Sequence, residues 1–251
     1  MALELKGVSK IYENSEQPTL SGIDLTIRDG EFVCIVGESG CGKSTLLNLC
    51  AGLEKTTSGQ ILLDGEEIKG PGADRTVMFQ EHGLYPWLNV IENVKFGMQL
   101  NGVSKEEQEH RAMHYLEMMQ LQNYRDYPIH QLSGGMRQRV ALARSLTMDS
   151  KVLLMDEPFS ALDKQTSNRL REELENIWMK TKKTVLFITH SVEEAIYLAD
   201  RVVVLSAEYS GVRDIVDVNL ERPRHVYADE FVALRHRVLD EVRMGIASEK
   251  K

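Results

Sequence analysis

The stretch Gly37-Glu38-Ser39-Gly40-Cys41-Gly42-Lys43-Ser44 decides the fold of this chain. It fits the pattern GxxxxGK[ST], in which two glycines, a lysine and a hydroxyl residue stand at fixed spacing. The apolar run Phe32–Val36 precedes the stretch, and the helix-like segment LLNLCAGL follows it from residue 46. An uninterrupted apolar run is typical of a strand buried on both faces of a parallel sheet. The sequence therefore predicts a strand, a phosphate-binding loop and a helix, in that order.

The residue types in this loop match the chemistry of phosphate. Glycines let the backbone curl until successive N–H groups converge on phosphate oxygens. The N-terminus of the following helix adds a dipole that favours an anion. Lys43 reaches the terminal phosphates, and the hydroxyl of Ser44 can ligate Mg²⁺. We assign nucleotide contacts to the whole loop and to the next residue, Thr45.

A pair of carboxylates supplies the second part of the predicted site. The apolar strand Val152–Met155 ends in Asp156-Glu157, and ligands of open α/β sheets bind at the carboxyl ends of strands. Asp156 is placed to hold Mg²⁺ through water. Glu157 points to the other side of the strand and can act on an attacking water as base or orienter. On its own, an Asp-Glu pair after a strand is weak evidence for such a site. Together with the phosphate loop, it is strong evidence.

The rest of the chain alternates between strand and helix signals, which is typical of an α/β sheet with right-handed crossovers. Strands are predicted at 3–5, 75–79, 152–155, 185–188 and 202–205, and Asp64-Gly65 predicts a hairpin between residues 61 and 68. Helical patterns run over 89–148, 163–180 and 192–199. Ser104 and Glu107 form a predicted capping box in front of a helix over 104–119. The fold class is therefore α/β with a helical insertion in the middle.

Composition excludes several classes of protein. The 251 residues include 30 Lys and Arg against 38 Asp and Glu, a net charge of −8, which disfavours bulk nucleic-acid binding. A hydrophobic content of 42% is enough to fill a core and excludes wholesale disorder. No secretory signal and no run of 18 apolar residues is present in the sequence, so we expect a cytoplasmic protein whose membrane-spanning partners, if any, are other chains.

The three cysteines, Cys34, Cys41 and Cys50, fit neither a disulfide framework nor a common zinc spacing. Cys41 lies inside the loop, amid backbone N–H groups and beside Lys43, a setting that favours the thiolate. We expect maleimide to modify Cys41 and bound ATP to protect it. Cys34 and Cys50, on a buried strand and a helix, should react more slowly.

The segment Leu132–Arg139, LSGGMRQR, resembles the signature sequence of ABC ATPases. Ser133, Gly134 and Gly135 precede a predicted helix, whose N-terminus would suit phosphate. One nucleotide site does not need two phosphate-binding elements. The resemblance explains the second one, because in this family the segment contacts the γ-phosphate of nucleotide held by a second copy of the chain.

Other positions follow the family pattern in order. Gln80 resembles the Q-loop glutamine, a Mg²⁺ and water contact linked to the membrane partner, and SALD, ending at Asp163, resembles the D-loop. His190, directly after the strand VLFIT, resembles the switch histidine that contacts the γ-phosphate. Tyr12 resembles the aromatic residue that stacks on adenine, although a tyrosine near an N-terminus is otherwise most often a packing residue.

The resemblance implies a P-loop NTPase (RecA-like) core sheet with an antiparallel β subdomain and an inserted helical subdomain. It implies one ATPase domain over residues 1–225, with a catalytic core at about 1–84 and 149–225 and the helical insertion at about 85–148. Residues 226–251 are predicted to form a short helical tail. Hydrolysis of ATP with Mg²⁺ would rely on Lys43, Gln80, Glu157 and His190, and the metal would be held by Ser44, Gln80 and Asp156.

Three further stretches, FQEHGLYPWLNVIENVKFG from residue 79, DEPFSALD from residue 156 and RPR from residue 222, resemble the ATPase subunits of nitrate, sulfonate and taurine importers. That group implies transmembrane permease subunits, a solute-binding protein as an indirect partner, and a position on the cytoplasmic face of the membrane. AEYSGVRD from residue 207 departs from the group, which more often has a Pro-Gly-Arg turn there.

Within this reading, the aromatic stretch Tyr85-Pro86-Trp87 is either a docking site for the permease or local core packing. Two other protein classes stay open as alternatives. A soluble ABC ATPase would usually carry two cassettes or a long coiled coil, and a small-molecule kinase would lack LSGGMRQR. An importer subunit for a different small solute is the third alternative.

Overall fold

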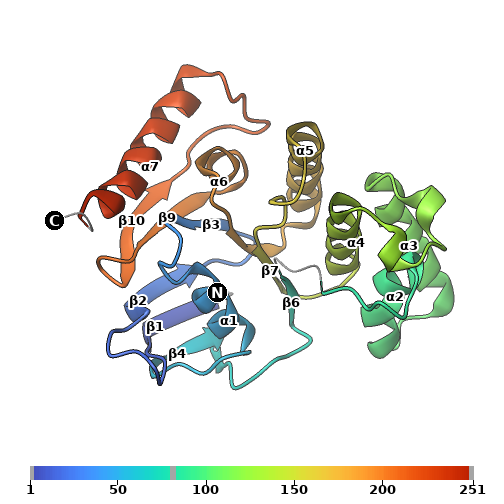
Figure 1. The fold of residues 1–251 in the computed structure, drawn as a ribbon, viewed down its shortest axis with the longest axis horizontal. Helices are drawn as coiled ribbons and strands as arrows, with labels where there is room; N and C mark the ends of the chain where they lie inside the picture. The colour runs from blue at the N-terminus through green and yellow to red at the C-terminus, as the bar shows by residue number, and fades with distance from the viewer. Residues whose placement is uncertain (1–2, 80–82, 249–251) are drawn as a thin grey trace.

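Two β-sheets form the framework of the computed structural model, which describes residues 3–79 and 83–248 (Figure 1). The smaller sheet is antiparallel, with the strand order β2-β1-β4-β5. Its strands are β1 (Leu3–Lys10), β2 (Leu20–Ile27), β4 (Ser58–Leu63) and β5 (Glu66–Glu67). Asp64 and Gly65 join β4 to β5 with φ angles of 50° and 86°, the left-handed pair that a tight hairpin needs. The predicted hairpin is confirmed.

The larger sheet has six strands in the order β10-β9-β3-β8-β7-β6. They are β3 (Phe32–Gly37), β6 (Arg75–Met78), β7 (Val152–Asp156), β8 (Thr184–Ile188), β9 (Arg201–Ser206) and β10 (Gly211–Asp217). Neighbouring strands run parallel, except β10, which pairs antiparallel with β9. The carboxyl ends of β3, β8 and β7 therefore lie side by side at one edge, which positions the site described below.

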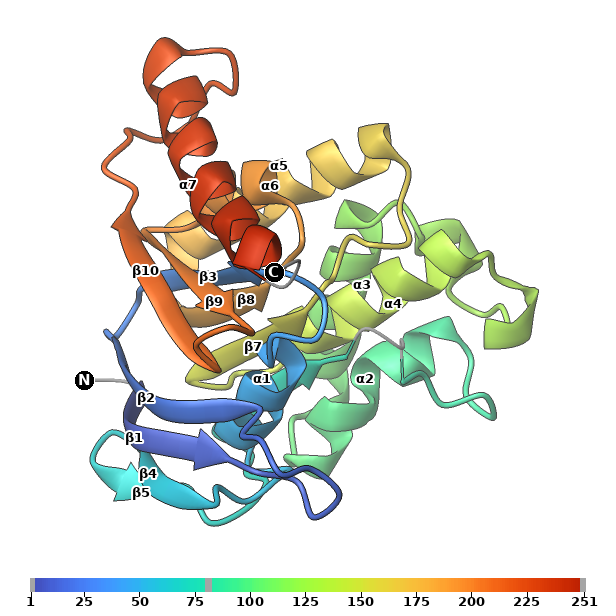
Figure 2. The same ribbon diagram turned by 60° about the vertical axis from the view of Figure 1, so that its left-hand side comes forward.

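Seven α-helices are present in the described residues. They are α1 (Lys43–Ala51), α2 (Val90–Leu100), α3 (Lys105–Met118), α4 (Gly134–Leu146), α5 (Lys164–Thr181), α6 (Val192–Leu198) and α7 (Asp229–Ser248). Helices α2, α3 and α4 lie together at one end of the molecule, whereas α7 lies over the β9–β10 side (Figures 1 and 2). No helix among the described residues is both long and apolar enough to cross a bilayer.

Strand β3 separates two hydrophobic cores. Val33 and Ile35 face α1 and the antiparallel sheet, whereas Phe32, Cys34 and Val36 face the other helices. Successive side chains of a strand point to opposite faces of the sheet, so a strand buried on both faces requires the continuous apolar run that the sequence shows. The core that contains Phe32, Cys34 and Val36 extends without a break into α2, α3 and α4, and this packing fixes these helices to the sheet.

Two details differ from the sequence predictions. Ser104 caps α3 by accepting a hydrogen bond from the Glu107 N–H at 3.3 Å, but the Glu107 carboxylate pairs with Arg111 one turn later, so only half of the predicted capping box forms. The C-terminal tail is helical as predicted, but α7 is 20 residues long and so longer than the short helix expected. Its buried residues Phe231 and Val238 belong to the core shared with β9 and α6, and this packing stabilises the whole helix.

Candidate nucleotide-binding site

A cleft of about 390 Å³ opens at the carboxyl end of β3. The glycine loop, Glu157 after β7 and His190 after β8 meet there because their strands are neighbours in the sheet. The cleft is lined by Thr19, Gly37, Ser39, Gly40, Gly42, Lys43, Ser44, Thr45, Glu157 and His190. The structure thus brings most of the predicted loop together with the two predicted groups that follow β7 and β8.

Two glycines of the loop are required by close contacts. A Cβ on Gly37 would lie 2.4 Å from the carbonyl oxygen of Leu205, and a Cβ on Gly42 would lie 2.7 Å from Leu20 Cδ2. Gly42 also has a φ of 96° as the residue that precedes α1, a conformation that glycine adopts without steric cost. The first and last fixed glycines of the pattern therefore let the loop close against β9 and the antiparallel sheet.

Lys43 turns its side chain back into the loop. Its Nζ donates hydrogen bonds to the carbonyl oxygens of Gly37 at 2.9 Å and Glu38 at 2.6 Å. The ammonium group is thereby held against the inner wall of the cleft, with little exposure to solvent. The side chain of Glu38 points elsewhere, since its Oε1 accepts a hydrogen bond from the Ala207 N–H at 3.2 Å. One cation is therefore fixed where the sequence predicts the terminal phosphates.

Asp156 and Ser44 form the oxygen-rich corner of the site. The Asp156 carboxylate accepts a hydrogen bond from the Ser44 hydroxyl. Burial raises the pKa of Asp156 and the charge of Glu157 raises it further, although the Ser44 hydrogen bond and Lys43 act in the opposite direction. Carboxylate and hydroxyl oxygens are donors that Mg²⁺ prefers. In the described part of the chain, no three or more His, Cys, Asp or Glu side chains gather closely enough to hold a metal by themselves.

Glu157 adopts an unusual backbone conformation, with a φ of 47°. Its N–H donates to the carbonyl oxygen of Ile188 at 3.0 Å, and its own carbonyl oxygen accepts from Ser160 Oγ at 3.0 Å. A non-glycine residue in this region costs free energy and persists only where its surroundings hold it. Glu157 Oε2 lies 3.3 Å from His190 Nδ1, so these two side chains are in contact at one end of the cleft.

Gln138, within the segment LSGGMRQR, connects α4 to the backbone around Glu157. It belongs to α4, is only 1% exposed, and donates from Nε2 to the Glu157 carbonyl oxygen at 3.2 Å. Its Oε1 accepts a hydrogen bond from the Ala161 N–H at 3.0 Å. A buried amide must find such partners. The sequence signal was a polar residue on the core-facing side of α4.

Ser133 and Asp163 each cap a helix. Ser133 Oγ accepts from the Met136 N–H at 3.3 Å at the start of α4, and Asp163 Oδ1 accepts from the Thr166 N–H at 2.9 Å at the start of α5. Gly134 and Gly135 do not precede α4 but are its first two residues. Neither Ser133 nor Asp163 is among the described residues that line the cleft, so the signature and the phosphate loop do not meet within one chain.

Tyr12 lies beside the start of α1 rather than in the lining of the cleft. Its hydroxyl donates to Glu54 Oε2 at 2.9 Å and lies 3.2 Å from Thr45 Oγ1. The ring is partly exposed and is held next to the phosphate loop by these contacts. Gln80, the predicted Q-loop glutamine, lies outside the described residues.

The prediction that the setting of Cys41 favours the thiolate is wrong. Cys41 is 1% exposed, and burial raises its pKa although Lys43 acts to lower it. The loop closes over the sulfur, so the loss of hydration outweighs the nearby positive charge. Cys34 and Cys50 are buried as predicted, burial raises the pKa of Cys50 to about 12, and all three thiols are free.

We therefore expect maleimide to label the native chain slowly at all three cysteines. Because burial raises the pKa of Cys41, its thiolate fraction at neutral pH falls, so Cys41 should react more slowly in the native chain than in the unfolded chain. Mass spectrometry of native and guanidinium-unfolded samples measures the rates. Rapid labelling of Cys41 in the native sample would contradict the burial seen here.

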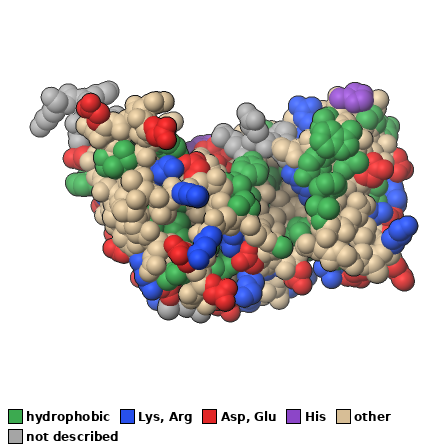
Figure 3. Space-filling model, turned by 90° about the horizontal axis from the view of Figure 1, so that it is seen from below, with side chains coloured by type: hydrophobic (Ala, Val, Ile, Leu, Met, Phe, Trp, Pro, Cys, Tyr) green, Lys and Arg blue, Asp and Glu red, His purple; other side chains and the backbone are tan. Residues whose placement is uncertain are grey.

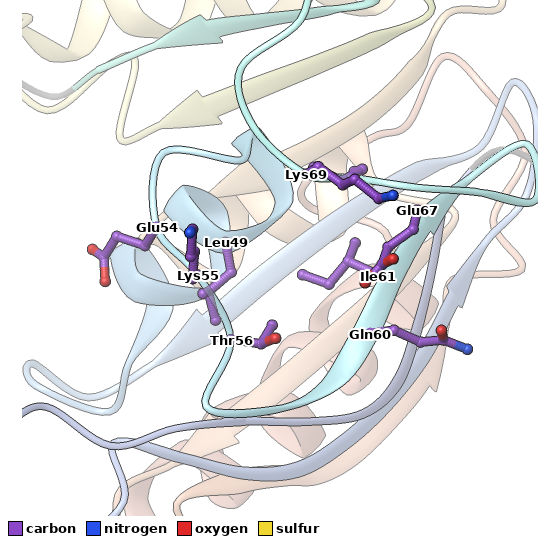
Figure 4. A pocket seen from close by; sticks show the side chains of 9 residues that line it. Leu49, Glu54, Lys55, Thr56, Gln60, Ile61, Glu67 and Lys69 are labelled. Carbon is purple, nitrogen blue, oxygen red and sulfur yellow. The ribbon is translucent and has the colours of Figure 1, made fainter.

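A second cavity, of about 360 Å³, lies between the C-terminal part of α1 and strand β4 (Figure 4). Leu49 and Ile61 form its apolar floor, and Lys55, Lys69 and Glu67 stand around it. It shares none of its described lining residues with the nucleotide cleft. This cavity is therefore a separate feature of the surface.

The comparisons with known proteins agree with this geometry. The model of the family described as "ABC transporter" matches residues 20–160. The nitrate import ATP-binding protein NrtD of Synechocystis sp. is 47% identical over 222 residues, which make up 88% of this chain and 84% of the relative. The aliphatic sulfonates import ATP-binding protein SsuB of Bacillus cereus is 40% identical over 248 residues, 98% of this chain and 97% of the relative.

Among solved structures, the ATP-binding cassette MJ0796, in a dimeric post-hydrolysis state bound to ADP and Pi, superposes with a TM-score of 0.79. It is 32% identical in sequence, and the match covers 87% of this chain and 100% of the cassette. The family model covers more than half of the chain, and the relatives extend the match to nearly all of it. The chain therefore belongs to the ABC transporter family, as one of its ATP-binding, ATP-hydrolysing subunits.

Proposed function

We propose that this chain powers the import of a small anionic solute, of the nitrate, sulfonate or taurine type, through separate permease subunits. The observation that supports this most strongly is the match to nitrate and sulfonate import proteins over nearly the whole chain. The protein would work at the cytoplasmic face of the membrane, and a solute-binding protein would be its indirect partner.

In this proposal the loop of one chain holds the phosphates of ATP. The backbone N–H groups of the loop and the little-exposed ammonium of Lys43 would provide positive charge that attracts phosphate. Tyr12, held beside Thr45, would stack on the adenine. Ser44 and Asp156, with Gln80 by resemblance, would hold Mg²⁺, which supplies charge neutralisation at the phosphate oxygens when bound.

Glu157 and His190 are the groups proposed to act at the bond that breaks. The Glu157 carboxylate would orient the attacking water and accept its proton. His190 would contact the γ-phosphate, and its 3.3 Å contact with Glu157 keeps the two side chains at one end of the cleft. The left-handed backbone of Glu157 supports this role, since strained residues cluster at functional sites.

A complete site is proposed to need a second copy of the chain. Ser133, Gly134, Gly135 and Asp163 lie outside the lining of the cleft within one chain, although the family pattern assigns all four to nucleotide. A head-to-tail pair would place them over the ATP of the other copy. The dimeric state of the MJ0796 cassette supports this arrangement. Each copy would contribute residues 1–225 as one ATPase domain, with residues 85–148 as its helical insertion.

The surface after Gln80 is proposed to receive the permease. The ring of Tyr85 packs against Phe96, with ring centroids 4.4 Å apart, and Trp87 is 73% exposed. The buried amide of Asn93 supports this turn, accepting from the Tyr85 N–H at 2.8 Å and donating to its carbonyl oxygen at 3.1 Å. Figure 3 shows hydrophobic side chains gathered on the end of the molecule that α2–α4 form. An exposed aromatic group on a fixed turn suits a protein interface.

A soluble ABC-type ATPase without a role in transport is the second candidate function, and genetics separates the two. Deleting the gene from its host should abolish growth on nitrate as nitrogen source, or on sulfonates or taurine as sulfur source, and leave growth on ammonium and sulfate normal. The wild-type gene should restore growth, and a gene encoding Lys43→Ala should not. Normal growth of the deletion strain on every one of these solutes would contradict the import proposal.

A further inference from the structure

His190 lies on a very short connection between β8 and α6. Thr189 before it is buried, and Ser191 after it caps α6, whereas the His190 side chain itself is 67% exposed. A cavity of about 250 Å³ borders this connection on the side of Phe159 and Ser160. Apolar packing therefore does not fill the space around His190, and the connection needs another means of support.

Hydrogen bonds to Glu194 provide that support. Glu194 Oε2 accepts from Thr189 Oγ1 at 2.6 Å, and the same hydroxyl oxygen accepts from the Ser191 N–H at 3.0 Å. Ser191 Oγ in turn accepts from the Glu194 N–H at 3.3 Å. These bonds join the residues on both sides of His190 into a closed ring. The first is a bond from a hydroxyl to a charged oxygen, a type roughly twice as strong as a neutral bond.

The same carboxylate reaches a neighbouring helix. Glu194 Oε1 accepts a hydrogen bond from Ser167 Oγ at 3.5 Å. Ser167 lies on α5, whose first residue follows the cap Asp163. Glu194 itself is absent from the described lining of the nucleotide cleft. It does line the cavity of about 250 Å³ beside His190 and Glu157. Its hydrogen bonds place it to act on His190 through Thr189 and Ser191.

We propose that Glu194 is a positioning residue for ATP hydrolysis, which holds the Thr189–Ser191 turn so that His190 faces Glu157. This inference rests on the proposed role of His190 at the γ-phosphate. The carboxylate accepts hydrogen bonds and does not exchange a proton during the reaction, so an amide of the same shape should replace it.

Glu193 provides a matched control on the same helix. Its carboxylate makes ion pairs with Lys164 at 3.1 Å, Arg171 at 3.3 Å and Arg235 at 3.6 Å. None of these contacts touches the His190 turn. Glu193→Ala should therefore lower the unfolding temperature and leave kcat close to wild type.

The test measures kcat for ATP hydrolysis, the affinity for ATP and the unfolding temperature of the purified full chain. Glu194→Ala should lower kcat about 10- to 100-fold, the loss typical of a displaced reacting group, with ATP affinity within about twofold of wild type. Glu194→Gln should restore most of the rate, because its amide oxygen still accepts from Thr189. Thr189→Val keeps the volume, removes the hydroxyl and should match Glu194→Ala. The double variant should be no slower than either single one.

Several outcomes would overturn the inference. One is a wild-type kcat in Glu194→Ala or Thr189→Val. Another is a Glu194→Gln variant that hydrolyses ATP as slowly as Glu194→Ala. A third is a double variant in which the losses of kcat from the two substitutions add. If Glu194→Ala does not fold, Thr189→Val and Glu194→Gln still decide the matter. A full-rate His190→Ala variant would remove the proposed role of His190, whereas a slow His190→Ala beside a fast Glu194→Ala would remove only this inference.

Discussion

We expect Glu157→Gln to bind ATP normally and to hydrolyse it about 100- to 10,000-fold more slowly than wild type, the contribution typical of a general base. Glutamine keeps the size of the side chain but cannot accept the proton of the water. The carbonyl oxygen of residue 157 keeps its hydrogen bonds to Gln138 and Ser160, so the turn should survive the substitution. Single-turnover hydrolysis and equilibrium binding of ATP measure the two effects.

The Glu157→Gln variant also tests whether two copies of the chain form a dimer around ATP. Uncleaved ATP would contact Lys43 of one copy and the Ser133 helix of the other, so it should stabilise a dimer by mass action. Sedimentation should show dimer with ATP and monomer with ADP or without nucleotide. Adding Ser133→Arg should abolish the dimer and leave ATP binding by the monomer intact. A variant that stays monomeric with ATP over a wide concentration range would contradict the shared site, and wild-type hydrolysis would remove Glu157 from its role.

Lys43→Ala should remove most of the ATP hydrolysis and weaken ATP binding. A charge-assisted hydrogen bond contributes about 1.5–3 kcal/mol, which corresponds to a loss of roughly 10- to 150-fold in affinity or rate for each bond. The substitution also leaves the carbonyl oxygens of Gly37 and Glu38 without their donor, so the empty loop should loosen. Turnover at saturating Mg-ATP and titration with ATP measure both effects.

Lys69→Ala is the control for this variant, because it removes the same charge from an exposed position beside the second cavity. It should leave turnover and ATP affinity unchanged. Near-wild-type turnover of Lys43→Ala at saturating Mg-ATP would contradict the assignment of the phosphate loop.

Local sequence patterns predicted the parts of the structure that depend on local forces. The apolar run from Phe32 predicted a strand buried on both faces, and Asp64-Gly65 predicted a hairpin, because backbone preference and side-chain alternation determine both features. The phosphate loop and the carboxylates at the end of β7 could be placed at one edge, since the carboxyl ends of parallel strands share it. The convergence of His190 with Glu157 followed from family resemblance, since a lone histidine carries no such signal.

Other features depend on contacts between distant residues and could not be predicted from local patterns. Whether Cys41 is charged depends on how tightly the loop closes over it, and the positive charge of Lys43 alone gave the wrong answer. Glu107 fits a capping box, but Arg111 competes for its carboxylate. The length of α7 depends on the core residues Phe231 and Val238, which pack against strands that lie next to it only in the folded chain.

The two hydrogen bonds of Gln138 have a consequence for the proposed pair of chains. Helix α4 begins at the segment that would contact the partner's ATP, and Gln138 within it is bonded to the backbone at Glu157 and Ala161 of its own chain. A displacement of α4 on engaging the partner's nucleotide would therefore pull on the turn that aims its own Glu157. In a symmetric pair, each ATP would contact α4 of the other chain, and that helix is bonded to the Glu157 turn of the other chain's own site. Each ATP site would therefore be linked to the other one. Cooperativity between the two ATP sites would then arise from α4 and the hydrogen bonds of Gln138, and would not need a separate regulatory element.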